Sequence, residues 1–238
     1  MIEYILAILL IGVMPARALY KSLRGKRDKA NRPKTYIQSS AIIVGLLVVL
    51  CYAWLRAARA PTPLGLDIPL SERGMIGLAI ALALFVALAI VEVVTKHKRQ
   101  GRTDEKAKEK LKNNELLPRT RRELTLFLGF ALLAGCGWEL LYRGFLIWFL
   151  VPHVGTIGAV CIAALAYGTA HGYKSRAQFL GSVVSAFAFT IAFVLTGSLW
   201  WLMLIHTAAG VAGGFGSYKL ASKHDGTMLL NSAETASS

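Results

Sequence analysis

Apolar residues along this chain gather into long runs that are separated by shorter polar stretches. An α-helix needs about 20 apolar residues to cross the hydrocarbon core of a bilayer. Runs close to that length cover residues 2–19, 36–55, 75–94, 124–150, 156–171, 179–195 and 199–215. The pattern therefore predicts an all-α membrane protein built as a bundle of about seven transmembrane helices.

The first run resembles a secretory signal peptide in length, but its charges differ. It carries Glu3 near its start and has no Lys or Arg before the apolar residues, so the usual positive region is missing. Pro15 and Arg17 interrupt the run near its end. We interpret it as a retained helix whose N-terminus lies outside the cell.

Composition supports the membrane assignment. Hydrophobic residues make up 55% of the 238 residues and charged residues only 17%, against about 25% in soluble proteins. The formal net charge of +14 comes from basic residues that crowd into two loops: residues 20–35 carry seven Lys and Arg and residues 96–122 carry eleven, against three in residues 56–73. Because basic loops stay in the cytoplasm, both termini can be placed: the N-terminus outside and the C-terminus in the cytoplasm.

The same charge pattern bears on partners. No nucleic-acid-binding motif accompanies the basic residues, so anionic membrane lipids are the expected partners and nucleic acid is not. We divide the chain into an N-terminal three-helix membrane region with two basic cytoplasmic loops (1–122), a set of core helices (123–218) and a cytoplasmic tail (219–238). The compact size and short tail favour a bacterial inner (plasma) membrane.

Two charged residues stand inside the fourth apolar run. Glu139 and Arg143 are spaced i and i+4, so they share a helix face and can pair. Charges at this depth are costly and usually functional or paired. Two interpretations remain open: Glu139 is a general base for water, or the two residues form a structural ion pair.

Two histidines stand in later runs. His171 follows Tyr167 by four residues near a helix end, where an interfacial, non-functional role is the alternative. His206 has no ionisable neighbour in its own run and so needs a partner from another helix. At a rise of about 1.5 Å per residue, the depths of Glu139, His171 and His206 overlap, so the three can converge.

These three side chains permit two chemistries. They can bind a metal ion such as zinc and leave a position for water. Alternatively, without a cofactor, Glu139 activates water while one histidine orients it and the other stabilises the oxyanion. No HExxH pair is present to favour zinc. The odd number and the spacing of Cys51, Cys136 and Cys161 argue against a disulfide framework. Cys136 lies near Glu139, but a packing role accounts for this residue better than a role as catalytic thiol.

The polar residues resemble the motifs of the CPBP family of intramembrane proteases (CAAX protease and bacteriocin-processing, or Abi). That family carries EExxxRG on one helix, FxxxH on a later one and HxxxN or HxxxD on a third. Here the corresponding segments are 138–144, 167–171 and 206–210, within residues 124–215. Trp138 replaces the first glutamate, Gly210 replaces the Asn or Asp, and Tyr167 replaces Phe conservatively.

The resemblance implies hydrolysis of a peptide bond in a membrane-associated protein or peptide, lipidated or not. It implies catalytic roles for Glu139, Arg143, His171 and His206, with a metallo- or glutamate-type mechanism left open. Trp138 and Gly210 motivate an alternative, a catalytically inactive member that acts as an immunity or partner-binding protein. A small transporter ranks last, because the chain lacks the internal symmetry of paired halves.

Overall fold

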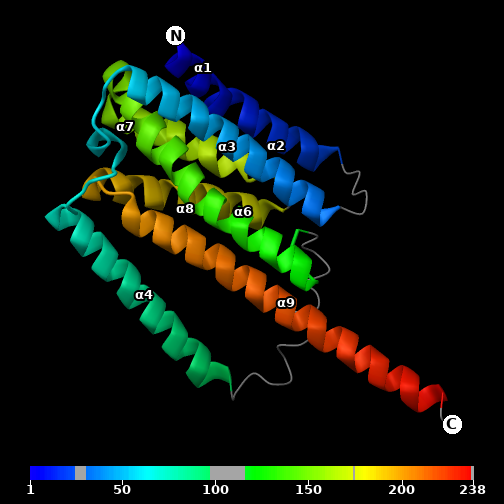
Figure 1. Ribbon diagram of the computed structural model, residues 1–238. Helices are drawn as coiled ribbons and strands as arrows, with labels where there is room; N and C mark the ends of the chain where they lie inside the picture. The colour runs from blue at the N-terminus through cyan, green and yellow to red at the C-terminus, as the bar shows by residue number, and fades with distance from the viewer. Residues whose placement is uncertain (25–30, 97–115, 174, 237–238) are drawn as a thin grey trace.

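The computed structural model describes residues 1–24, 31–96, 116–173 and 175–236, and these contain helices but no strand (Figure 1). Residues 25–30 and 97–115, which include part of the first predicted basic loop and most of the second, lie outside the described residues. The elements are α1 (Ile2–Ile8), the π-helix η1 (Leu9–Val13), α2 (Met14–Leu23), α3 (Arg32–Arg56), the 3-10 turn η2 (Thr62–Leu64), α4 (Glu72–Lys96), α6 (Arg121–Glu139), the π-helix η3 (Leu140–Phe145), α7 (Leu146–Ala170), α8 (Arg176–Thr196) and α9 (Trp200–Ala236).

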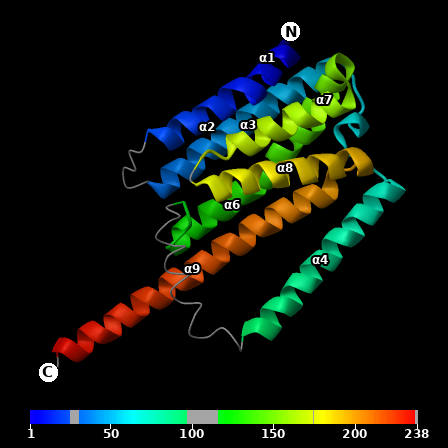
Figure 2. The same cartoon turned by 180° about the vertical axis from the view of Figure 1, so that it is seen from behind.

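The helices pack side by side, with the bundle's contacts centred on α6 and α7. Helix α6 contacts α3 and α9, while α7 contacts α8 and α2. Helix α4 contacts α9 and α8, and its far end stands away from the bundle in both views (Figures 1 and 2). Helix α9 extends well beyond the other helices and takes in most of the predicted tail, 219–238.

Four helical stretches among the described residues are long and apolar enough to cross a membrane: Ile2–Leu23, Arg32–Arg56, Arg121–Ala170 and Arg176–Thr196. The protein is therefore an integral membrane protein, although the prediction of about seven spans is not confirmed. Many large apolar side chains on these helices are exposed, including Val48, Ile157 and Leu180. In a bilayer such side chains face lipid rather than water.

The longest of these stretches, Arg121–Ala170, has 50 residues and is divided by a kink. Gly155 has φ +69° and non-helical geometry, which glycine adopts without the steric cost that a Cβ would add. The two runs predicted at 124–150 and 156–171 lie on either side of it. The kink lets one continuous stretch of helix supply two separate apolar segments.

A π-helical turn also explains why Pro15 does not end the first helix. Pro15 stands in the first turn of α2, directly after η1. Proline lacks the backbone N–H that would bond to the preceding turn, so a helix that continues through it must adjust locally. The wider π-turn re-sets the helix just before the proline, so the first run stays helical from Ile2 to Leu23.

The connection between α3 and α4 fixes the start of α9. The backbone N–H of Leu199 donates to the carbonyl oxygen of Gly65 at 2.8 Å. The indole Nε1 of Trp200 donates to the carbonyl oxygen of Asp67 at 3.0 Å. These bonds anchor the first turn of α9, the helix that carries His206.

Candidate active site

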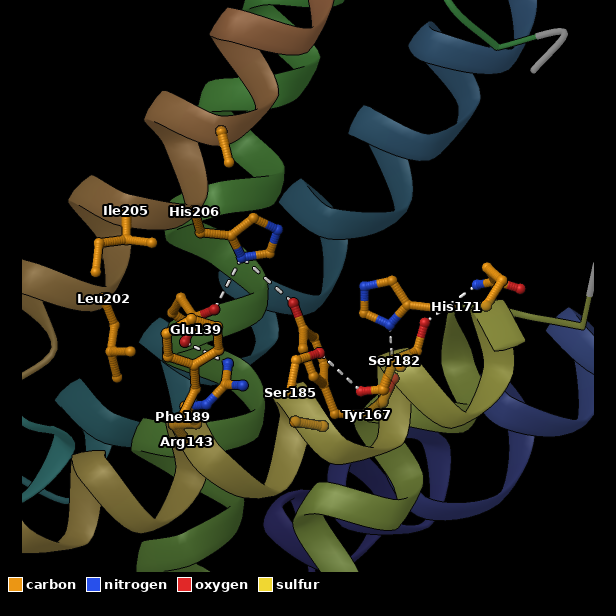
Figure 3. Close-up of a pocket in the computed structure, with 14 residues that line it drawn as sticks. Glu139, Arg143, Tyr167, His171, Ser182, Ser185, Phe189, Leu202, Ile205 and His206 are labelled. Carbon is orange, nitrogen blue, oxygen red and sulfur yellow. Dashed lines mark hydrogen bonds and ion pairs between the residues drawn. The ribbon is translucent and has the colours of Figure 1, made fainter. Parts of the chain in front are cut away.

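The polar residues singled out in the sequence come from three helices that meet in the bundle (Figure 3). Glu139 is the last residue of α6, and Arg143 lies one turn later in η3. His171 caps the end of α7, and His206 lies in the first half of α9. All four line a single pocket, so the structure brings the predicted site residues together.

Glu139 and Arg143 form a buried ion pair. Arg143 Nη1 donates to Glu139 Oε2, and the side chains are 1% and 4% exposed for Arg143 and Glu139 respectively. The guanidinium also lies over the ring of Tyr167, 4.6 Å from its centroid. Because both charges are withdrawn from water, each depends on the other for its stability in the fold.

The π-helix η3 begins directly after Glu139 and contains Arg143. Its residues Leu141 to Phe145 are all buried. A π-turn widens the helix and redirects its side chains, and such turns are frequent at functional sites. Here the Arg143 side chain points toward Glu139 and lies over the ring of Tyr167 on α7.

His206 is the third partner of the buried pair. Its Nδ1 lies 2.8 Å from Glu139 Oε1, and its side chain is 31% exposed. A carboxylate oxygen only accepts hydrogen bonds, so Nδ1 donates in this contact. Glu139 is thus held through one oxygen by Arg143 and through the other by His206, while the His206 Nε2 is left for the pocket.

His171 is held by its own helix. Its Nδ1 lies 2.9 Å from the carbonyl oxygen of Tyr167. Because a carbonyl can only accept, Nδ1 carries the hydrogen and the neutral ring presents a lone pair at Nε2. That nitrogen can accept a hydrogen bond or a proton from a molecule in the pocket.

Tyr167 is a pocket residue that sequence reasoning missed. It replaces the phenylalanine of the FxxxH motif, and the exchange looked conservative because the ring is kept. Its hydroxyl, however, lies 3.3 Å from His206 Nδ1. The sequence does contain a signal, because a buried tyrosine hydroxyl usually finds a polar partner. Which residue that partner is cannot be predicted without the fold.

The pocket has a volume of about 450 Å³ and two unlike walls. Gln178, Ser182 and Ser185 of α8 form a polar wall, in which Gln178 Nε2 donates to Ser182 Oγ at 3.1 Å. Leu202 and Ile205 of α9 contribute an apolar wall. The cavity therefore offers hydrogen-bonding groups for water or a peptide backbone beside an apolar surface for side chains.

The zinc alternative requires Glu139, His171 and His206 as a ligand set. Among the described ranges of the chain, no group of three or more His, Cys, Asp or Glu is close enough to hold a metal ion. Both Glu139 oxygens already contact other side chains. The arrangement as it stands does not fit a three-ligand zinc site.

The two departures from the motifs both lie in packed positions. The ring of Trp138 packs against that of Tyr142, with 5.9 Å between centroids. A Cβ added at Gly210 would lie 3.0 Å from Ala131 Cβ, so this position faces α6. Cys136, considered from the sequence as a catalytic thiol, lies with its Sγ 3.9 Å from Thr207 Oγ1 and does not line the pocket.

Gly135 sets the distance between α6 and α9 beside the site. A Cβ at this position would lie 2.7 Å from the backbone nitrogen of Thr207 and 2.9 Å from its Cα. Because the added Cβ would meet the backbone of Thr207, Gly135→Ala must push α6 and α9 apart. This displacement would occur one turn from Glu139 and next to His206. We expect at least a tenfold loss of any activity that the site supports, since misplacement by about 1 Å can cost a hundredfold.

Gly129→Ala is the matched control for this variant, because nothing lies within 4 Å of a Cβ there on the same helix. Activity and thermal stability of both variants would be measured in detergent. Equal activities of the Gly135 and Gly129 variants would contradict the role assigned to this close approach.

Residues 120–212 match the family model of the type II CAAX prenyl endopeptidase Rce1-like proteins. The match covers the three motif segments and confirms the resemblance to the CPBP and CAAX protease family. It gives no support to the alternative of an inactive member. Neither the curated proteins nor the solved structures yield a match to the chain.

Proposed function

We propose that this protein is an intramembrane endopeptidase of the CAAX type, in which Glu139 activates water to hydrolyse a peptide bond in a membrane-associated protein or peptide. The observation that carries the proposal is the convergence of Glu139, Arg143, His171 and His206 on one pocket, inside the range that matches the endopeptidase family. We place the protein in the bacterial inner membrane, with its N-terminus outside and its C-terminus in the cytoplasm.

Glu139 takes the role of general base. A carboxylate has about four lone-pair sites, so Glu139 can accept a further hydrogen bond from water while Arg143 and His206 hold its two oxygens. As the water oxygen attacks the carbonyl carbon, its proton passes to Glu139. When the C–N bond breaks, the same proton goes to the leaving amine.

The two histidines take different roles because their Nδ1 atoms are bound differently. His171 Nε2 carries a lone pair and accepts a hydrogen bond from the water, which orients it for attack. His206 donates through Nδ1 to Glu139, so it can stabilise the oxyanion only with a second proton on Nε2. The positive charge of that imidazolium is balanced by the Glu139 carboxylate before attack and by the oxyanion itself once Glu139 has taken the water proton.

The proposal is tested by cleavage assays on the protein reconstituted in lipid vesicles. The substrates are peptides with and without a prenylated cysteine, assayed in the presence and absence of a chelator. We expect His171→Ala to lower cleavage by about a hundredfold, because misplacement of a reacting group by about 1 Å can cost that much, and wild-type cleavage to persist with chelator. The control is His153→Ala, because His153 lies on α7 and contacts Phe149 and Tyr4 outside the pocket.

The outcomes separate the open alternatives. Cleavage that survives His171→Ala would contradict the assigned role of this residue. Loss of wild-type cleavage with chelator would favour the zinc mechanism instead. Absence of cleavage for both kinds of peptide would overturn the proposed function.

A further inference from the structure

The Tyr167 side chain contacts three of the other polar residues of the site, Arg143, His171 and His206. Its ring lies under the guanidinium of Arg143, 4.6 Å from ring centroid to Cζ. Its ring also meets that of His171 edge-on, with centroids 4.7 Å apart. Its hydroxyl reaches His206 Nδ1. One side chain on α7 therefore touches groups that come from η3, α7 and α9.

The surroundings of the ring make its position rigid. Tyr167 is only 6% exposed, and its ring packs against that of Tyr142 with 5.0 Å between centroids. Because the ring cannot move away, its hydroxyl is held at a fixed place beside His206. A preorganised hydrogen-bonding group of this kind costs no reorganisation when the neighbouring groups change their protonation.

His206 Nδ1 has two neighbours of different character. Glu139 Oε1 at 2.8 Å only accepts as a carboxylate, whereas the Tyr167 hydroxyl at 3.3 Å can accept or donate. If Glu139 takes up the proton of the attacking water, its hold on the Nδ1 hydrogen weakens. The Tyr167 hydroxyl is the group positioned to keep Nδ1 hydrogen-bonded at that stage.

We propose that Tyr167 is a positioning residue, whose hydroxyl keeps the His206 imidazole oriented while the protonation of Glu139 changes. The inference rests on the proposed peptidase function for its kinetic consequence. The hydrogen bond between the Tyr167 hydroxyl and His206 Nδ1 does not depend on that function and can be tested separately. A phenylalanine at this position would keep the ring contacts and remove the hydroxyl, and with it the bond to His206 Nδ1.

The first arm of the test compares Tyr167→Phe with wild type in cleavage kinetics across pH. We expect kcat to fall about tenfold, the size expected for one lost hydrogen bond, with KM within twofold and a displaced pH profile of kcat. Tyr142→Phe is the matched control, because its hydroxyl donates to the carbonyl oxygen of Leu10 at 3.0 Å, away from the histidines. Its kcat and pH profile are expected to match wild type.

The second arm needs no activity. Nitrogen-15 NMR of histidine-labelled protein would follow the His206 ring signals, assigned by their loss in His206→Gln. We expect Tyr167→Phe to shift the Nδ1 signal and Tyr142→Phe to leave it in place. An unshifted Nδ1 signal in Tyr167→Phe would overturn the proposal. An unchanged kcat of Tyr167→Phe in an active enzyme would overturn it as well. If wild type is inactive but the Nδ1 signal shifts, only the proposed peptidase function is overturned.

Discussion

Replacement of Glu139 with glutamine is expected to lower peptide cleavage by at least about a hundredfold, because general-base catalysis contributes about 10²- to 10⁴-fold. Glutamine keeps the shape of the side chain, and its amide oxygen can still accept from Arg143, whereas its NH2 group can bond to His206 Nδ1 only when the imidazole hydrogen is on Nε2. It cannot take a proton from water. The loss should therefore appear in kcat, with KM little changed, in vesicles that hold the purified protein.

Glu123→Gln is the control for this experiment. Glu123 lies on the same helix, where it pairs with Arg32 at 3.3 Å and completes a capping box with Thr120. Glutamine also fits the capping box, so this variant removes a carboxylate from α6 without disturbing its start. Cleavage by Glu139→Gln within threefold of the Glu123→Gln rate would contradict the role of general base and leave a structural role for the buried pair.

The sequence predicted the helices because apolar runs report directly on bilayer-length segments. All seven runs coincide with helices of the structure to within one residue at either end, but only four helical stretches among the described residues meet the criteria for a span. The run at 199–215 lies in a helix that continues to Ala236, whose polar extension was predicted as a separate tail. Hydropathy describes individual segments and cannot say where a helix continues into water.

The site was predictable where it depends on local spacing. The i,i+4 separation predicted that Glu139 and Arg143 can pair, and they do. The isolation of His206 in its own run predicted a partner from another helix, and Glu139 supplies it. In each case a charged or polar group in an apolar segment requires a partner, and few were available.

The remaining geometry depends on contacts between helices that no local pattern encodes. The π-helix η3, which contains Arg143 and is buried from Leu141 to Phe145, is not signalled by any local spacing in the sequence. The approach of α6 to α9 at Gly135 is a property of both surfaces together. The hydroxyl of Tyr167 acquired a role only because α9 brings His206 next to it.

Removal of the Arg143 charge is expected to destabilise the protein more than any other single change at the site. Arg143→Met keeps the length and apolar stem of the side chain but leaves the Glu139 carboxylate buried without its cation. Breaking a buried pair in this way costs about 3–5 kcal/mol. Unfolding in mixed micelles with increasing denaturing detergent measures the loss against wild type.

The double variant Glu139→Gln/Arg143→Met separates the two interpretations of the pair that the sequence leaves open. With neither charge present, no unpaired ion remains, so we expect most of the lost stability to return, because replacement of a whole buried pair is often close to neutral. A purely structural pair would then give a folded protein that cleaves at the wild-type rate. On the proposed mechanism the double variant is folded and inactive, because restored stability cannot replace the carboxylate that accepts the water proton. If Arg143→Met unfolds at the same denaturant concentration as wild type, the pair contributes little to the fold and Arg143 acts on the orientation of Glu139 alone.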